Sequence, residues 1–137
     1  MRSQDSQGVW EGLLNDLYRR SLRGKHLQLI ITDGCPGLAG AIQTVYPRVL
    51  QQRCWVHKMR NIREKARKRD RDKLKQMTQA IYLGLSQTAR AAFRCFKLRW
   101  QAKYPTMVKQ LEKDLPDLLW FFSFPKHLWK QLRTTYH

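Results

Sequence analysis

A short apolar run at residues 27–32 lies between two segments of helical spacing, and this alternation restricts the choice of fold. The length and β-branched content of the run predict a buried strand, which ends at Asp33-Gly34. The segment before it, residues 9–22, predicts a helix that buries one apolar stripe and closes at Gly24. The stripe consists of Val9, Trp10, Leu13, Leu14, Leu17 and Tyr18.

A second helix and a second strand are expected next along the chain. After Pro36, apolar residues recur at helical spacing until Tyr46-Pro47, where proline ends the helix. Residues 49–56 alternate imperfectly between two faces, and this pattern favours a strand. Helix, strand, helix and strand in this order are typical of an α/β layer, whose functional groups collect at the carboxyl ends of the strands. Asp33 lies at one such end, and His57 follows the other.

The chain changes character in its second half. Basic residues fill positions 58–75, and apolar residues then recur at helical spacing almost to the end, with breaks near Gly84 and Tyr104. We therefore expect a partial α/β core over residues 1–58, followed by a basic helix and an all-helical lobe over residues 59–137. The large aromatic side chains are expected to form core rather than stacking platforms for bases. They are Trp55, Trp100, Trp120, Trp129, Phe121, Phe122 and Phe124.

Positive charge dominates the composition: 27 Lys and Arg residues stand against 10 Asp and Glu, a net charge of +17. So large an excess attracts polyanions, and nucleic acid is the leading partner because neutralised phosphates supply most non-specific affinity. A basic surface that serves only solubility is the alternative. The run on the expected helix would either track DNA phosphates or be merely solvated. Its candidate DNA-binding residues are Lys58, Arg60, Arg63, Lys65, Arg67, Lys68, Arg69 and Arg71.

Cysteine usage and hydropathy indicate the compartment. The three cysteines, Cys35, Cys54 and Cys95, are odd in number and widely spaced, which is not a disulfide framework and favours a reducing interior. No early apolar run resembles a signal peptide, and the apolar stretches are too short to cross a bilayer. We therefore expect a soluble cytoplasmic protein without a membrane partner.

Two short motifs could carry chemistry. Asp33-Gly34 at a strand end could hold a divalent cation on a rigid frame, or could be an ordinary turn pair. Cys54 and His57, separated by two residues, match half of a zinc site. The sequence has no second ligand pair, so zinc would need other cysteines or histidines to fold towards them. The alternative is a small core cysteine beside a hydrogen-bonding histidine. A Cys-His nucleophile pair is disfavoured, because nothing in the sequence identifies a third group to orient the histidine.

The order of these motifs is more specific than any one of them. The chain reads Ile31-Thr-Asp33-Gly34, then Gly37-Leu38, Ala41-Ile42, Tyr46-Pro47, Gln52-Arg-Cys54, Val56-His57 and Arg60-Asn61. Later come Ile81-Tyr82, Phe93, Trp100, Lys103-Tyr104-Pro105, Phe121-Phe122, Phe124-Pro125 and Leu132-Arg-Thr-Thr. This pattern resembles the bacterial insertion-sequence transposases of the Mutator type, with Tyr46 where that family usually has Phe. The match runs from about residue 9 to the end.

The resemblance implies a partial ribonuclease-H-like core followed by a helical insertion, here residues 77–133. Such transposases use two Asp and one Glu to bind two divalent ions, Mg²⁺ or Mn²⁺, which activate water or a 3′-hydroxyl for phosphodiester hydrolysis and strand transfer. Asp33 matches the second acid and would be a metal ligand. Cys54 and His57 match the family's Cys/Asp-x-x-His signature near the catalytic site, in a structural or positional role.

Two of the three acids have no match in this sequence. In the family the first lies on a strand upstream of residue 1, and the third, the Glu of a TTNAIE segment, would follow residue 137; Tyr136 also replaces the usual Asn. One carboxylate does not organise a two-metal site, so we expect no tight metal binding and no transposition by this chain alone. It would then be a piece of a DNA transposase, a frameshifted product or a gene remnant. The alternative is a non-catalytic basic module that binds DNA, another copy of itself or the full-length transposase, associated with the bacterial nucleoid.

Overall fold

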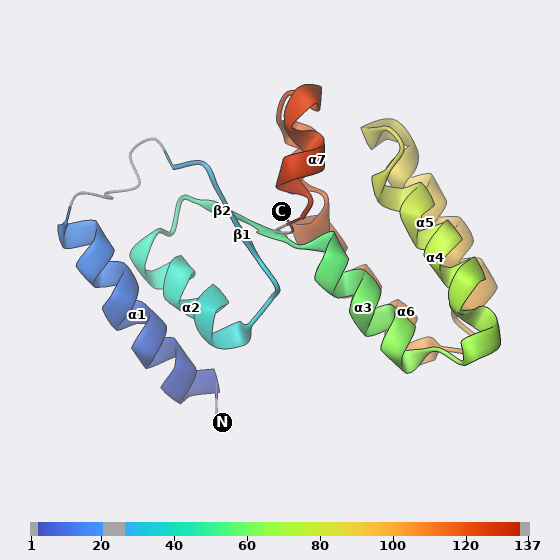
Figure 1. The fold of residues 1–137 in the computed structure, drawn as a ribbon, viewed down its shortest axis with the longest axis horizontal. Helices are drawn as coiled ribbons and strands as arrows, with labels where there is room; N and C mark the ends of the chain where they lie inside the picture. The colour runs from blue at the N-terminus through green and yellow to red at the C-terminus, as the bar shows by residue number, and fades with distance from the viewer. Residues whose placement is uncertain (1–2, 21–26, 135–137) are drawn as a thin grey trace.

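A computed structural model describes residues 3–20 and 27–134 (Figure 1). Two parallel strands lie between a pair of helices on one side and a larger group of helices on the other. The order of elements is α1 (Ser3–Arg19), β1 (Leu29–Thr32), α2 (Pro36–Val45), β2 (Leu50–Arg53), α3 (Trp55–Lys65), η1 (Lys68–Asp70), α4 (Arg71–Tyr82), α5 (Ser86–Trp100), α6 (Pro105–Leu118), η2 (Trp120–Ser123), η3 (Lys126–Leu128) and α7 (Trp129–Leu132).

The strands β1 and β2 pair in parallel and are joined by the crossover helix α2. Their register aligns Leu29 with Leu50 and Thr32 with Arg53, so the carboxyl ends of the two strands lie side by side. A small core of Ile42, Tyr46 and Val49 holds α2 to the strands. The α/β class and the helix–strand–helix–strand order expected from the sequence are confirmed. The ribonuclease-H-like arrangement stays a proposal, because these two strands are the whole sheet within the described residues.

The second strand is shorter than its sequence pattern suggested. We expected it to run to Val56, but it ends at Arg53, and α3 begins at Trp55. Tertiary contacts explain the error: the Trp55 N–H donates to the carbonyl of Arg133, far away in sequence, and the indole is buried in the helical lobe. The prediction that residues 49–56 form one strand is therefore wrong at its carboxyl end.

The helices from α3 to α7 form a second, larger core. Its buried aromatic residues include Trp55, Trp100 and Phe121, while Phe122 and Trp129 pack against it from partly exposed positions. The expectation that these five side chains form core is confirmed. The remaining two, Trp120 and Phe124, are also only partly exposed. The division into two units stays a prediction, and its expected boundary after residue 58 falls inside α3.

The basic run is not one helix. We expected a continuous helix over residues 58–75, but the chain leaves the helical conformation at Ala66 and Arg67, and the charges are divided among α3, η1 and α4. Tyr104 fixes this break, because its hydroxyl accepts the N–H of Arg67 at 2.9 Å and donates to Asp70 at 2.6 Å. Hydrogen bonds from Lys103 and Tyr104 hold the pKa of Asp70 below its usual value.

Only part of the apolar stripe on α1 is buried. Leu14 packs against the small core under α2, but Val9, Leu13 and Leu17 are 75%, 49% and 37% exposed. The expectation that the whole stripe is buried is therefore wrong, since α1 meets the rest of the protein mainly through α2. The expected closing residue, Gly24, lies outside the described residues.

The exposure of Leu13 gives a direct prediction. The substitution Leu13→Ser should change the free energy of unfolding by no more than about 0.5 kcal/mol, because little apolar area is lost from the interior. Leu14→Ser, one residue along the same helix, should cost about 1 kcal/mol or more. Urea unfolding of both variants tests this, and an equal loss in the two would show that the Leu13 face is covered in solution.

Candidate functional site

The carboxyl edge of the two-stranded sheet carries an exposed carboxylate. Asp33 follows β1 directly, and its Oδ1 accepts the N–H of Cys35 at 3.0 Å. The next residue, Gly34, has φ +92° and donates its N–H to the hydroxyl of Thr32 at 3.2 Å. These bonds fix the turn after the strand, and the left-handed conformation requires glycine. Asp33 thus presents carboxylate oxygens on a fixed turn, at the edge of the sheet where functional groups collect.

Arg53 shares this edge, although sequence reasoning did not single it out. It ends β2 opposite Thr32, and its guanidinium lies against the α-carbon of Gly34 so closely that a β-carbon there would collide with Nη1. Only the pairing of the strands brings these residues together, because they are far apart in sequence. The local sequence gave no signal beyond one more arginine in a basic chain.

Cys54 and His57 flank the start of α3. Cys54 is buried at the N-cap position of α3, and its side chain makes no capping hydrogen bond to that helix. Its Sγ lies 3.9 Å from the hydroxyl oxygen of Thr134. Its N–H donates to the carbonyl of Thr32 at 2.7 Å, which continues the strand pairing by one residue. His57 is partly exposed on the first turn of α3. Across residues 3–20 and 27–134, no three His, Cys, Asp or Glu side chains gather in a way that could hold a metal ion.

A buried ion pair joins this edge to the helical lobe. Lys58 Nζ contacts Asp114 Oδ2 at 2.6 Å, with side chains 9% and 5% exposed, and Gln110 donates to the same carboxylate. Burial alone would raise the pKa of Asp114, but the hydrogen bonds from Lys58 and Gln110 and the charges of Lys58 and Arg53 lower it below its usual value. Asp114 therefore stays ionised inside the protein.

Sequence reasoning missed Asp114, although a signal was present. α6 places Leu111, Leu115 and Leu118 at helical spacing, and Asp114 lies within that buried stripe. A charge in an apolar stripe is almost always paired, so a cation partner could have been expected. That partner proved to be Lys58, which we had counted among the DNA-binding residues.

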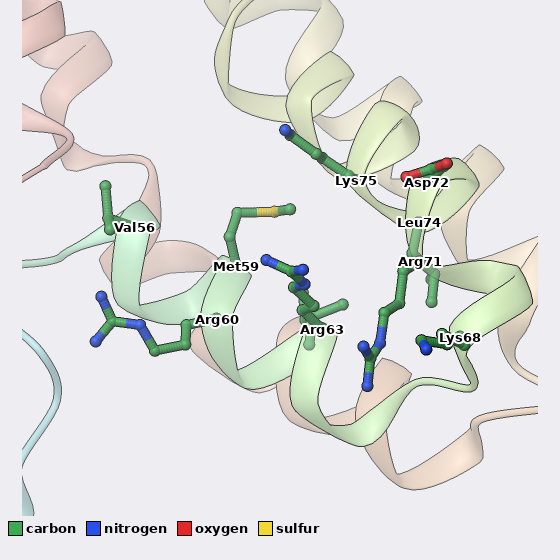
Figure 2. Close-up of a pocket in the computed structure, with 10 residues that line it drawn as sticks. Val56, Met59, Arg60, Arg63, Lys68, Arg71, Asp72, Leu74 and Lys75 are labelled. Atoms are coloured by element: carbon green, nitrogen blue, oxygen red, sulfur yellow. The ribbon is translucent and has the colours of Figure 1, made fainter.

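Four of the other candidate cations line a groove of about 490 Å³ between α3 and α4 (Figure 2). Its apolar floor and walls come from Val56, Met59, Ile62 and Leu74. Figure 2 shows Arg63 extending from α3 and Arg71 extending from α4, with the ends of the Arg71 and Lys68 side chains close together. The cationic side chains that line it are Arg60, Arg63, Lys68, Arg71 and Lys75, against one acid, Asp72.

The groove sorts the candidate DNA-binding residues into three groups. Arg60, Arg63, Lys68 and Arg71 line it. Lys65, Arg67 and Arg69 are exposed outside it, and Lys58 is buried against Asp114. The Nε atom of Arg71 is buried without a hydrogen-bond partner among the described residues. Such a concentration of like charge persists only because the groove opens to solvent, and it favours an anionic ligand.

Comparison with known proteins decides the family. The model of the transposases of the Mutator family matches residues 1–137. The chain belongs to the Mutator family of transposases. It is 41% identical over 133 residues to the transposase of insertion sequence element IST2 from Acidithiobacillus ferrooxidans, a match that covers 96% of this chain and 45% of that protein.

Other Mutator-family relatives match to a similar extent. The chain is 33% identical to the transposase of IS6120 from Mycolicibacterium smegmatis and 31% identical to that of IS1201 from Lactobacillus helveticus. These matches cover 96% and 93% of this chain but 41% and 34% of the relatives. The chain therefore spans less than half the length of these Mutator-family transposases. Within the part that the structure describes, every helix is too short or too polar to span a membrane.

Proposed function

We propose that this chain is the part of a Mutator-family transposase that holds DNA next to a metal-dependent active site. In this proposal the α3–α4 groove contacts the DNA backbone, and Asp33 supplies one carboxylate of a ribonuclease-H-like site. The observation that carries the proposal is the concentration of Arg60, Arg63, Lys68 and Arg71 around one open groove. α3 begins two residues after β2 ends, so the groove wall is attached directly to the strand edge that carries Asp33.

Asp33 fits a hard divalent ion such as Mg²⁺ or Mn²⁺, because it is an exposed carboxylate on a fixed turn. When bound, such ions would activate the attacking oxygen and stabilise the leaving oxygen of a phosphodiester. Asp33 belongs to no group of three or more His, Cys, Asp or Glu side chains among the described residues, so the other ligands would come from further chain of the kind that the longer relatives possess. Asp33 would supply one carboxylate ligand to the metal, and the α3–α4 groove would bind the DNA backbone.

Salt-dependent DNA binding tests the proposal. The triple variant Arg60→Gln, Arg63→Gln and Arg71→Gln should bind a DNA duplex about 10 to 100-fold more weakly at low salt, and should lower the slope of log affinity against log salt by about 2 to 3. Fluorescence anisotropy with a labelled duplex measures both quantities. The matched control is Arg90→Gln, Arg94→Gln and Lys109→Gln, which removes the same charge from exposed positions on α5 and α6.

The control separates a site from a diffuse field. If the control triple loses as much affinity as the groove triple, then net charge alone attracts DNA and the groove has no special role. If neither triple changes binding, DNA is not held by this part of the chain. A non-catalytic DNA-binding module would also lose DNA affinity in the groove triple. It would differ from the proposed function because Asp33 would have no role in catalysis.

A further inference from the structure

Arg53 lies where both strands end, and its surroundings leave its charge largely uncompensated. Its Nη2 atom is 3.7 Å from Asp114 Oδ1, beyond the range of a good hydrogen bond. Lys58 contacts the other oxygen of that carboxylate at 2.6 Å. One carboxylate thus faces two cations, and the closer one neutralises it. The Arg53 side chain remains 29% exposed at the strand edge.

Gly34, the residue after Asp33, leaves room for the Arg53 guanidinium. The absence of a β-carbon at Gly34 leaves the space that Nη1 and Cζ of Arg53 occupy. Asp33 is the preceding residue and is itself exposed. A planar group with several donors therefore lies against the turn that follows Asp33, with Asp114 restraining it from the side of the lobe.

We propose that Arg53 binds a phosphate of the DNA backbone at the carboxyl edge of the sheet, next to Asp33. This inference rests on the proposed function and adds a second phosphate contact that is separate from the α3–α4 groove. Guanidinium suits the task because its fork of N–H donors matches two oxygens of one phosphate, whereas Lys offers only a point charge. The loose contact with Asp114 orients Arg53 without using up its donors.

Two substitutions of different kinds test this inference. Arg53→Gln should weaken binding of a short DNA duplex about 10-fold, and Arg53→Lys should restore part of the loss. Gly34→Ala should also weaken binding by several-fold, because the new methyl displaces the guanidinium without changing the net charge. In the double variant, Gly34→Ala should add nothing to Arg53→Gln, since both remove the same contact.

The control is Arg48→Gln, an exposed arginine just before the opposite end of β2. Equal losses for Arg48→Gln and Arg53→Gln would overturn the inference, as would a folded Gly34→Ala protein with undiminished affinity. Circular dichroism establishes folding, and if Gly34→Ala fails to fold, the comparison of Arg53→Gln with Arg53→Lys and Arg48→Gln decides. Loss with the groove triple but none with Arg53→Gln would leave the proposed function standing and remove this inference alone.

Discussion

Replacing Asp114 by Asn is expected to lower the free energy of unfolding by about 3 kcal/mol at neutral pH, because it leaves the buried Lys58 ammonium without its counter-charge. The Lys58 side chain is only 9% exposed and has its shortest contact with this carboxylate. The reciprocal change, Lys58→Met, should cost less, about 1 to 2 kcal/mol, since Asp114 keeps Gln110 and Arg53 as partners. Urea unfolding at pH 7 measures both.

The stabilisation by the ionised Asp114 carboxylate should depend on pH in one direction. The pKa of Asp114 is lower in the folded protein than in the unfolded chain, so its stabilisation is fully present above the unfolded value of about 3.9. It is lost as the pH falls through the folded pKa, where the carboxylate takes up a proton. The difference between the original protein and Asp114→Asn should therefore be constant near neutrality and shrink below about pH 4. A difference that grows in acid would contradict the assignment.

A double variant shows whether the charges of the Lys58–Asp114 pair are needed for stability, or only the filling of the buried space. Lys58→Met combined with Asp114→Leu removes both charges and adds an apolar side chain to the buried stripe of α6. A buried ion pair replaced by well-packed apolar residues often costs little, so this protein should recover most of the stability lost in Asp114→Asn. If the double variant is as unstable as Asp114→Asn, the carboxylate has a further structural role, and its restraint of Arg53 is the first candidate.

Local pattern was sufficient for the elements whose ends are decided nearby. β1 and α2 agree closely with the sequence because the apolar run, the Asp33-Gly34 turn and Pro36 all act within a few residues. The end of β2 and the break at Ala66 are decided by Arg133 and Tyr104, which no window around those positions contains. In both cases long-range hydrogen bonds override the local preference.

The same distinction applies to the candidate site. The position of Asp33 after a strand could be predicted because a strand end is a local feature, and the cations that line the groove lie within the basic run of the sequence. Lys58 does not contribute to that surface because it pairs with Asp114. Arg53 lies beside Gly34 because of the strand register. Sequence spacing shows that charges are present, but only packing shows which of them are already paired.

The second large effect is expected at Trp55, which connects the strand edge to the lobe. Trp55→Ala should lower the free energy of unfolding by about 3 to 5 kcal/mol, because a large side chain is removed from a close-packed core. The indole is 1% exposed and stacks on Tyr82 with ring centroids 4.6 Å apart. Its Nε1 donates to the carbonyl of Leu118 at 2.7 Å. Thermal and urea unfolding measure the loss.

Trp55→Phe separates the packing of the ring from the hydrogen bond of the indole. The carbonyl of Leu118 also accepts a bond from Gln52 Nε2 at 2.8 Å, so it remains satisfied when the indole N–H is lost. We therefore expect Trp55→Phe to cost only about 1 to 2 kcal/mol, mostly from the reduced volume. Gln52 donates to the lobe and its Oε1 accepts the N–H of Phe121, so two side chains at the end of β2 hold the lobe in place. If Trp55→Phe proves as damaging as Trp55→Ala, the indole hydrogen bond rather than ring packing attaches the lobe, and Gln52 does not substitute for it.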